Sequence, residues 1–249
     1  MIPTRMMPMG AGGKPSTGYW GLCFTAEQAN SSVAMVTTGN APSVSLEHST
    51  DASNWTPFEV GRTTITLASV GDMVYLRAGS GGNTKFGTDL SNYNSFALTG
   101  KIAASGNIMS MLNGSTPLDS ITEGFCFCGL FENAAALTQA PELPARVVSS
   151  QAYAKLFRLC SSLLKGPTLR GVSSDGTPAC GRQLFDNCSS LKEISVNWTS
   201  WPPSLQRAFW ARGLAAGGVF RCPLALGTNE TITRGNSNCP NGWTVINTD

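Results

Sequence analysis

The sequence predicts a β-rich protein of two domains, an antiparallel β-sandwich followed by a short α/β solenoid of repeats with a C-terminal cap. Three observations favour this fold class. Short runs of β-branched and aromatic residues recur between turn residues in the first half of the chain. A motif recurs with a period in the twenties in the second half. Only 13% of the 249 residues are charged, against an average of about 25%, which disfavours a helical bundle.

The composition also limits the classes of partner. The net charge is +2, and Ser, Thr and Asn together account for 67 residues, so small neutral polar groups dominate the surface. Nucleic-acid binders gain affinity from many Lys and Arg side chains on phosphates, and we therefore expect no nucleic-acid partner. No run approaches the roughly 18 to 20 consecutive apolar residues that span a bilayer, so we expect no membrane insertion. The hydrophobic share of 41% is sufficient for a core.

Residues 1–17 form a segment rich in Met, Gly and Pro, a composition that excludes a helix or a central strand. Two interpretations fit it, a flexible leader and a docking arm that becomes ordered against a partner, and we favour the arm. The segment has no apolar stretch of about 7 to 15 residues and is not expected to be a Sec signal peptide. We therefore expect another route to the exterior, such as release of a virus particle by lysis.

Residues 18–115 form the predicted β-sandwich. Thr63–Leu67 alternates polar and apolar residues, as a half-buried strand does, and the Gly-rich stretch 79–83 is predicted to be a loop. Several closely spaced strands without an intervening helix indicate an antiparallel sandwich. The predicted strands are Tyr19–Thr25, Ser32–Thr38, Ser43–His48, Thr63–Ala68, Asp72–Ala78 and Ser95–Ile102.

Residues 116–249 form the predicted repeat domain. Leu130-Phe131 recurs as Leu156-Phe157, 26 residues later, and Leu184-Phe185 follows after a further 28 residues. Such periods, with a short helix, a leucine and a short strand, indicate a leucine-rich solenoid whose units bury Leu and Phe against their neighbours. Further matches at the offset of 26 are Leu137 with Leu163, Pro141 with Pro167, and Leu143 with Leu169; the third copy has a predicted strand at Glu193–Val196, and a degenerate fourth copy begins near Leu205–Trp210.

These motifs resemble the BspA-type leucine-rich repeats of gut Bacteroidales proteins and their phages. The repeat pieces that carry the resemblance are residues 140–145 and 156–163, and the preceding β domain and the closing segment 239–245 also fit this family. The resemblance covers residues 19–247 and implies surface recognition or adhesion rather than catalysis. The chain has only about three copies, and its second copy lacks the Pro-Ala after Leu169, so a compact module is expected rather than a long stalk.

Few residues could carry chemistry. The single histidine, His48, lies at the end of a predicted strand beside Ser49 and Asp51, which need not converge in space, so we expect no catalytic triad and no enzyme activity. The eight cysteines lack metal-ligand spacing; we expect no metal and no cofactor, and we interpret most of them as core residues. Cys222 and Cys239 flank a Gly- and Asn-rich loop, and a disulfide between them is left open.

Candidate binding residues lie on the short strands of the repeats. Alternation along these strands is expected to place six polar side chains on one face, which in leucine-rich folds often contacts a ligand: Glu142, Thr168, Arg170, Glu193, Ser195 and Asn197. The alternative is that they are only solvated polar residues. Trp55, Trp198 and Trp201 are candidates to stack on sugar rings, and Trp198 and Trp201 equally fit a role in closing the open end of the solenoid.

The first functional hypothesis is a structural and recognition component of a tailed-phage particle, in the tail, a tail fibre or a capsid fibre. The arm would then dock on other virion structural proteins, and the repeat domain would face a glycan or protein of the host surface. A homo-oligomer is expected, a trimer by analogy with fibre proteins. The alternatives are a leucine-rich-repeat adhesin on the bacterial cell surface and a glycan-cleaving enzyme that uses paired carboxylates.

Overall fold

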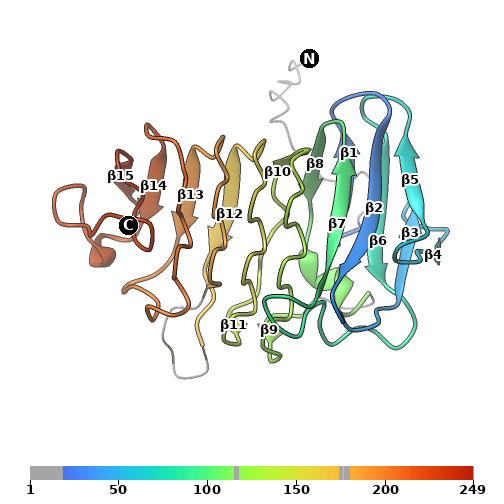
Figure 1. Cartoon of the computed structure of the whole chain (residues 1–249), viewed down its shortest axis with the longest axis horizontal. Helices are drawn as coiled ribbons and strands as arrows, with labels where there is room; N and C mark the ends of the chain where they lie inside the picture. The colour runs from blue at the N-terminus through green and yellow to red at the C-terminus, as the bar shows by residue number, and fades with distance from the viewer. Residues whose placement is uncertain (1–18, 115–117, 174–175, 177–179, 249) are drawn as a thin grey trace, which may run out of the picture.

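A computed structural model describes residues 19–114, 118–173, 176 and 180–248. This part of the chain is β-rich, and antiparallel strands at its N-terminal end continue into a β-solenoid of about five turns. Figure 1 shows the chain progressing along the long axis of the molecule, from the blue and cyan strands to the red ones. The predicted docking arm, residues 1–17, lies outside the described residues.

The antiparallel part contains strands β1 to β8, arranged in two sheets. Strands β5, β2 and β7 form a three-stranded sheet, and β4, β3, β6, β1 and β8 form one half of a ten-stranded sheet. The two sheets pack together through Phe24 of β1 and Phe96 of β7, whose ring centroids are 4.9 Å apart. The strands are β1 (Cys23–Ala26), β2 (Ser31–Thr38), β3 (Leu46–Ser49), β4 (Thr56–Pro57), β5 (Thr64–Leu67), β6 (Met73–Ala78), β7 (Tyr93–Thr99) and β8 (Ile102–Ser105).

Each of the six strands predicted for this part overlaps an observed one, with ends that differ by a few residues. The predicted strand Ser95–Ile102 is divided between β7 and β8 by a turn at Gly100, whose φ of 77° lies in the region that glycine tolerates best. Strand β4 was not predicted, because its two residues carry no periodic signal.

The second half of the ten-stranded sheet is parallel. Strand β8 pairs with β1 in antiparallel fashion and with β10 in parallel fashion, so it joins the two parts of the molecule. The sheet continues through β10 (Leu137–Gln139), β12 (Lys165–Leu169), β13 (Glu193–Val196), β14 (Val219–Cys222) and β15 (Thr244–Asn247). One hydrophobic cluster extends from Leu22 to Val245, across the predicted domain boundary near residue 115.

The remaining regular elements are short. Strands β9 (Ser120–Ile121) and β11 (Val147–Val148) form a separate parallel pair. Asn107 caps the N-terminus of the 3₁₀ helix η1 (Ile108–Met111), because its side chain accepts a hydrogen bond from the Met109 amide. A second 3₁₀ helix, η2 (Leu224–Leu226), follows β14. The described part of the chain holds no helix of the length and hydropathy needed to cross a bilayer.

The short helices predicted for the repeats are absent from the described residues, and arcs of turns take their place. Lys155, Gln183 and Phe209 occupy equivalent positions in successive arcs, with φ values of 55°, 58° and 54°. The Arg158 amide closes one turn on the Lys155 carbonyl at 3.0 Å, while the Lys155 amide donates to the Arg182 carbonyl of the next coil at 2.8 Å. A helix would need each of these amides for its own i−4 carbonyl, so amides that bond between coils prevent helix formation.

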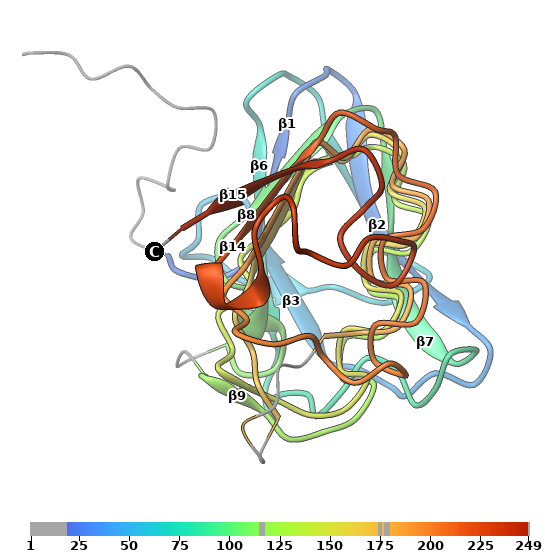
Figure 2. The same ribbon diagram turned by 90° about the vertical axis from the view of Figure 1, so that its left-hand side faces the viewer.

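The repeated Leu and Phe positions form continuous columns in the core. Phe131 and Phe157 stack with ring centroids 5.4 Å apart, and Phe157 and Phe185 stack at 5.7 Å with planes only 7° apart. The column ends at Trp210, which lies 6.0 Å from Phe185 in the predicted fourth copy. In Figure 2, viewed along the solenoid, the turn arcs of successive coils overlie one another opposite the sheet. The sequence offsets of 26 and 28 therefore correspond to successive coils.

All eight cysteines are buried, and none of them forms a disulfide. The disulfide left open between Cys222 and Cys239 is not formed. The Cys160 thiol donates to the Phe131 carbonyl at 3.0 Å, and the Cys188 thiol donates to the Phe157 carbonyl at 2.9 Å. These two thiols therefore satisfy carbonyl groups of the preceding coil at equivalent repeat positions.

Candidate functional site

The outer face of the parallel ladder carries the predicted binding residues. Along β12 and β13 the apolar side chains of Leu169, Ile194 and Val196 are buried in the core. Because successive side chains of a strand point to opposite faces, the polar residues between them point outward. None of the six candidates is buried: Glu142, Arg170 and Asn197 are exposed, and Thr168, Glu193 and Ser195 are half-buried.

The strand register arranges these side chains in rows across the sheet. Thr168 pairs with Ser195, and Ser195 pairs with Arg221 of β14. Glu142 lies 26 residues before Thr168, at the same repeat position, and pairs with Asn107 on its other side. Paired neighbouring strands are roughly 4.8 Å apart, so Thr168, Ser195 and Arg221 present polar groups at a regular spacing along the solenoid axis.

A groove of about 470 Å³ opens on this face between β10 and β12. The two strands share one paired position, Gln139 with Lys165, and the register shifts along β12 between Lys165 and Thr168. Pro141 and Pro167 follow in successive coils, and proline has no amide hydrogen for the ladder. The groove is lined by Gln139, Ala140, Pro141, Glu142, Leu143, Pro144, Lys165, Gly166, Pro167, Thr168 and Arg170. It therefore brings together three of the predicted residues, Glu142, Thr168 and Arg170, while the other three lie on or just after β13.

Glu193 is held in an ion-pair triad. Its Oε1 is 2.9 Å from Lys165 Nζ and 3.5 Å from Arg221 Nε. The hydrogen bond from Lys165, with the charges of both cations, holds the pKa of Glu193 below its ordinary value. Lys165 and Arg221 were missed as members of this face. The alternation in Val219-Phe220-Arg221-Cys222 could have placed Arg221 outward, since Phe220 and Cys222 are buried.

Glu142 and Arg170 differ from this triad. Within the described residues neither side chain forms an ion pair or a hydrogen bond, although both line the groove. The groove thus offers one carboxylate and one guanidinium that the described residues leave without a hydrogen-bond partner.

The three tryptophans proposed for sugar stacking are not available as free platforms. Sugar stacking was expected only of an exposed ring, and Trp198 is 1% exposed because it belongs to the core beneath β13. Trp201 stacks on Phe220 at 5.9 Å. Trp55 lies between the Arg77 guanidinium, 4.0 Å from its ring centroid, and the Tyr19 ring at 5.3 Å.

His48 lies near Thr56 rather than in a catalytic arrangement. Thr56 Oγ1 is 3.1 Å from the His48 Nδ1 atom, and partial burial lowers the pKa of the imidazole. The Ser49 hydroxyl donates to Asp51 Oδ1 at 2.8 Å, and Asp51 also accepts hydrogen bonds from the Ser53 and Asn54 amides. Asp51 therefore stabilises its own turn. Among the described residues no group of three His, Cys, Asp or Glu side chains is arranged to hold a metal ion.

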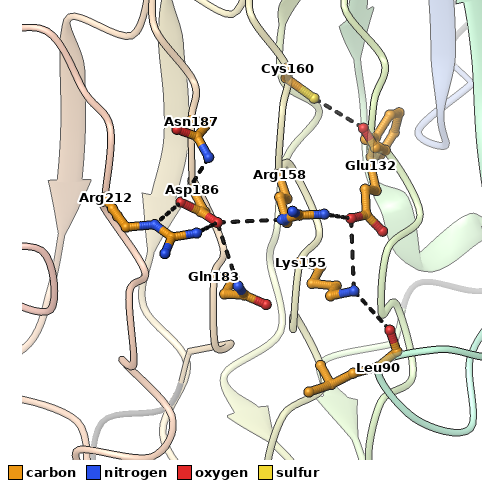
Figure 3. Close-up of polar contacts among 10 residues, drawn as sticks. Leu90, Glu132, Lys155, Arg158, Cys160, Gln183, Asp186, Asn187 and Arg212 are labelled. Carbon is orange, nitrogen blue, oxygen red and sulfur yellow. Dashed lines mark hydrogen bonds and ion pairs between the residues drawn. The ribbon is translucent and has the colours of Figure 1, made fainter.

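A second polar cluster, the charge ladder, crosses the turn arcs on the side opposite the sheet (Figure 3). Glu132, Arg158, Asp186 and Arg212 occupy equivalent positions in four successive arcs, so the charge alternates in sign from coil to coil. Arg158 pairs with Glu132 on one side and lies 3.3 Å from Asp186 Oδ2 on the other. Arg212 donates to Asp186 through both Nε and Nη2 at 2.8 Å.

The two acids of the charge ladder are buried, Asp186 completely. Lys155 lies 3.8 Å from Glu132 and also donates to the Leu90 carbonyl at 2.8 Å. This cluster is not among the sites that the residue pattern predicted. Its signal was the residue that directly follows each Leu-Phe pair, which is Glu132, Arg158 and Asp186 in turn. We assign the charge ladder to coil registration, because a shift by one coil would bring like charges together.

No family model, no curated protein and no solved structure matches this chain.

Proposed function

We propose that this protein is a structural and recognition component of a tailed-phage particle, in the tail, a tail fibre or a capsid fibre, and that it contributes to virion assembly and host-surface attachment. The observation that carries the proposal is the polar outer face of the parallel ladder, on which all six predicted binding residues point away from the core. The resemblance of the repeats to the BspA type supports the same role.

In this proposal, residues 18–115 are a β-sandwich domain and residues 116–249 are a leucine-rich-repeat domain with a C-terminal cap. The arm, residues 1–17, and the β-sandwich dock on other virion structural proteins, and a homo-oligomer forms, with a trimer as the expected symmetry. The repeat face meets a glycan or protein of the host surface. The shared sheet and the large hydrophobic cluster that crosses the boundary support this division of labour, because they fix the recognition face relative to the docking end.

The geometry suits recognition because the outward side chains project from hydrogen-bonded strands. Such side chains are already positioned before a ligand arrives, so binding orders fewer groups and less affinity is lost to conformational entropy. Thr168, Ser195 and Arg221 lie in one row on three neighbouring strands. A repeating row of this kind fits an extended ligand with regularly spaced polar groups.

The same face is less suited to glycan cleavage. A general acid at neutral pH needs a carboxyl group whose pKa is raised, whereas Lys165 and Arg221 lower the pKa of Glu193, so Glu193 is unsuited to the role of the acid. This contrast favours recognition over hydrolysis. A bacterial adhesin would use the same face and would differ in location, on the cell surface instead of the virion.

The test is mass spectrometry of phage particles purified by density gradient, with quantification relative to the major tail and capsid proteins. We expect peptides of this chain at a fixed ratio to one of those proteins in every preparation. Absence from the particles would contradict the proposal, and recovery from the surface fraction of uninfected bacteria would support the adhesin instead.

A further inference from the structure

The groove between β10 and β12 combines apolar residues with two charged side chains, Glu142 and Arg170, that form no ion pair or hydrogen bond within the described part of the chain. Pro141, Pro144 and Pro167 line it, with Pro144 half-buried and the other two buried, and its charged residues are Glu142, Lys165 and Arg170. Its volume of about 470 Å³ falls within the range of roughly 300 to 1,000 Å³ that is usual for small-ligand sites. It is thus large enough for a short saccharide and too small for a folded domain.

The charges of the groove differ in availability. Lys165 is engaged with Glu193 at 2.9 Å, so its ammonium group is already compensated. Arg170 has no acidic partner within the described residues and is exposed. A guanidinium presents its donors in a planar fork that matches a carboxylate. The unpaired cation of the groove is therefore best suited to a ligand carboxylate.

Two other classes of ligand fit less well. A peptide that binds by strand addition needs amide donors at regular intervals, and the three prolines remove three of them from the lining. A nucleic acid gains its affinity from several cations along the phosphates, and the groove offers Arg170 with only one further cation, Lys165, which is paired. Sugar hydroxyls, in contrast, are suitable donors to the exposed Glu142 carboxylate, and a sugar C–H face can pack on the half-buried ring of Pro144.

We propose that this groove binds an acidic saccharide, whose carboxylate accepts hydrogen bonds from Arg170 and whose hydroxyl groups donate to Glu142. Thr168 lies at the same repeat position as Glu142 in the next coil and provides a neutral hydroxyl to the adjoining sugar. This inference rests on the proposed recognition function and narrows its ligand to one chemical class.

The experiment measures binding of the full chain to tetragalacturonate by isothermal titration calorimetry. The matched probes are the same tetrasaccharide with its carboxyl groups reduced to alcohols, and tetraglutamate as an acidic peptide. We expect tetragalacturonate to bind and the two matched probes to bind at least tenfold more weakly. The Arg170→Gln variant should weaken tetragalacturonate binding about ten- to hundredfold, as loss of a charged hydrogen bond does, and should abolish the preference for the acidic sugar.

Arg146→Gln is the control variant, because Arg146 is an exposed arginine that does not line the groove, and its affinity should equal that of the wild type. Equal binding of the acidic and reduced sugars, tight binding of tetraglutamate, or an unchanged affinity of Arg170→Gln would each overturn the inference. If any of these results were found and the chain were nevertheless detected in phage particles, the saccharide inference would fail while the proposed function would remain. Absence of the chain from particles would instead remove the proposed function itself.

Discussion

The Asp186→Asn substitution tests the charge ladder, because it removes one charge and keeps the size of the side chain. Asp186 is fully buried and accepts two hydrogen bonds from Arg212 at 2.8 Å, and Arg158 lies 3.3 Å away. Removing one partner of a fully buried ion pair costs about 3 to 5 kcal/mol, whereas an exposed pair contributes about 0 to 1 kcal/mol.

The expected loss lies between these limits. The Arg212 side chain is 40% exposed and can recover hydration, and Arg158 keeps its pair with Glu132. We therefore expect the free energy of unfolding to fall by about 2 to 3 kcal/mol, which corresponds to a decrease in Tm of roughly 5 to 10 °C for a chain of this size.

Urea denaturation followed by tryptophan fluorescence measures this difference. Glu59→Gln is the matched control, because Glu59 forms an exposed ion pair with Arg62 at 3.3 Å, and its substitution should cost less than about 0.5 kcal/mol. A double-mutant cycle with Arg212→Gln should give a coupling energy of about 1 to 2 kcal/mol. If Asp186→Asn were as stable as the Glu59→Gln control, the reasoning about the charge ladder would be refuted.

Three further predictions follow from the core, the thiols and the ion-pair triad. Phe157→Ala should lower the free energy of unfolding by about 3 to 5 kcal/mol, because this buried ring lies between two stacked rings. The control Phe209→Ala, at a residue that is 41% exposed, should lower it far less in the same denaturation assay. Burial raises the pKa of Cys23 to about 11 and raises the pKa of Cys126 further still. A thiol reagent at pH 8 should therefore label the native protein slowly, and should label all eight cysteines once the chain is denatured. Rapid labelling of the native protein would contradict the burial of these thiols. The folded-state pKa of Glu193 lies below its ordinary value of 4.5, so its ion pairs stabilise the fold at neutral pH, by at most about 1 kcal/mol, and this contribution is lost as the pH falls through the lowered pKa. The difference in unfolding free energy between wild type and Glu193→Gln should therefore shrink below pH 4.5. A difference that stayed constant with pH would argue against the triad.

Periodic features of the fold were predictable from the sequence. The Leu-Phe pairs at offsets of 26 and 28 gave the stacked columns, because one coil buries its residues only against the next. The strand Glu193–Val196 was predicted with its observed ends, since its alternation of outward Glu193 and Ser195 with buried Ile194 and Val196 is complete.

Other features depend on interactions between coils and carry little local signal. Phe209 and Leu159 adopt positive φ values of 54° and 64°, which residues of these types rarely do, so their sequence predicts helix rather than turn. The parallel pairing of β8 with β10 joins the two predicted domains in one sheet, and neither strand alone specifies that partner.

The candidate site shows the same limit. Alternation placed the six polar residues on the outward face, where they lie. It could not show that Glu193 is paired with Lys165 and Arg221 or that Glu142 and Arg170 share a groove, because these relations join different coils.

We propose that the outer face of the parallel ladder attaches the protein to the host surface. The most direct test is a cell-binding assay in which the labelled full chain, altered by Thr168→Lys and Ser195→Lys, is titrated onto host cells. The matched control carries Thr64→Lys and Thr66→Lys, at exposed positions of β5 in the three-stranded sheet. We expect the first double variant to bind at least tenfold more weakly than wild type, and the control to bind as tightly as wild type. Equal binding of wild type and both variants would contradict this proposal.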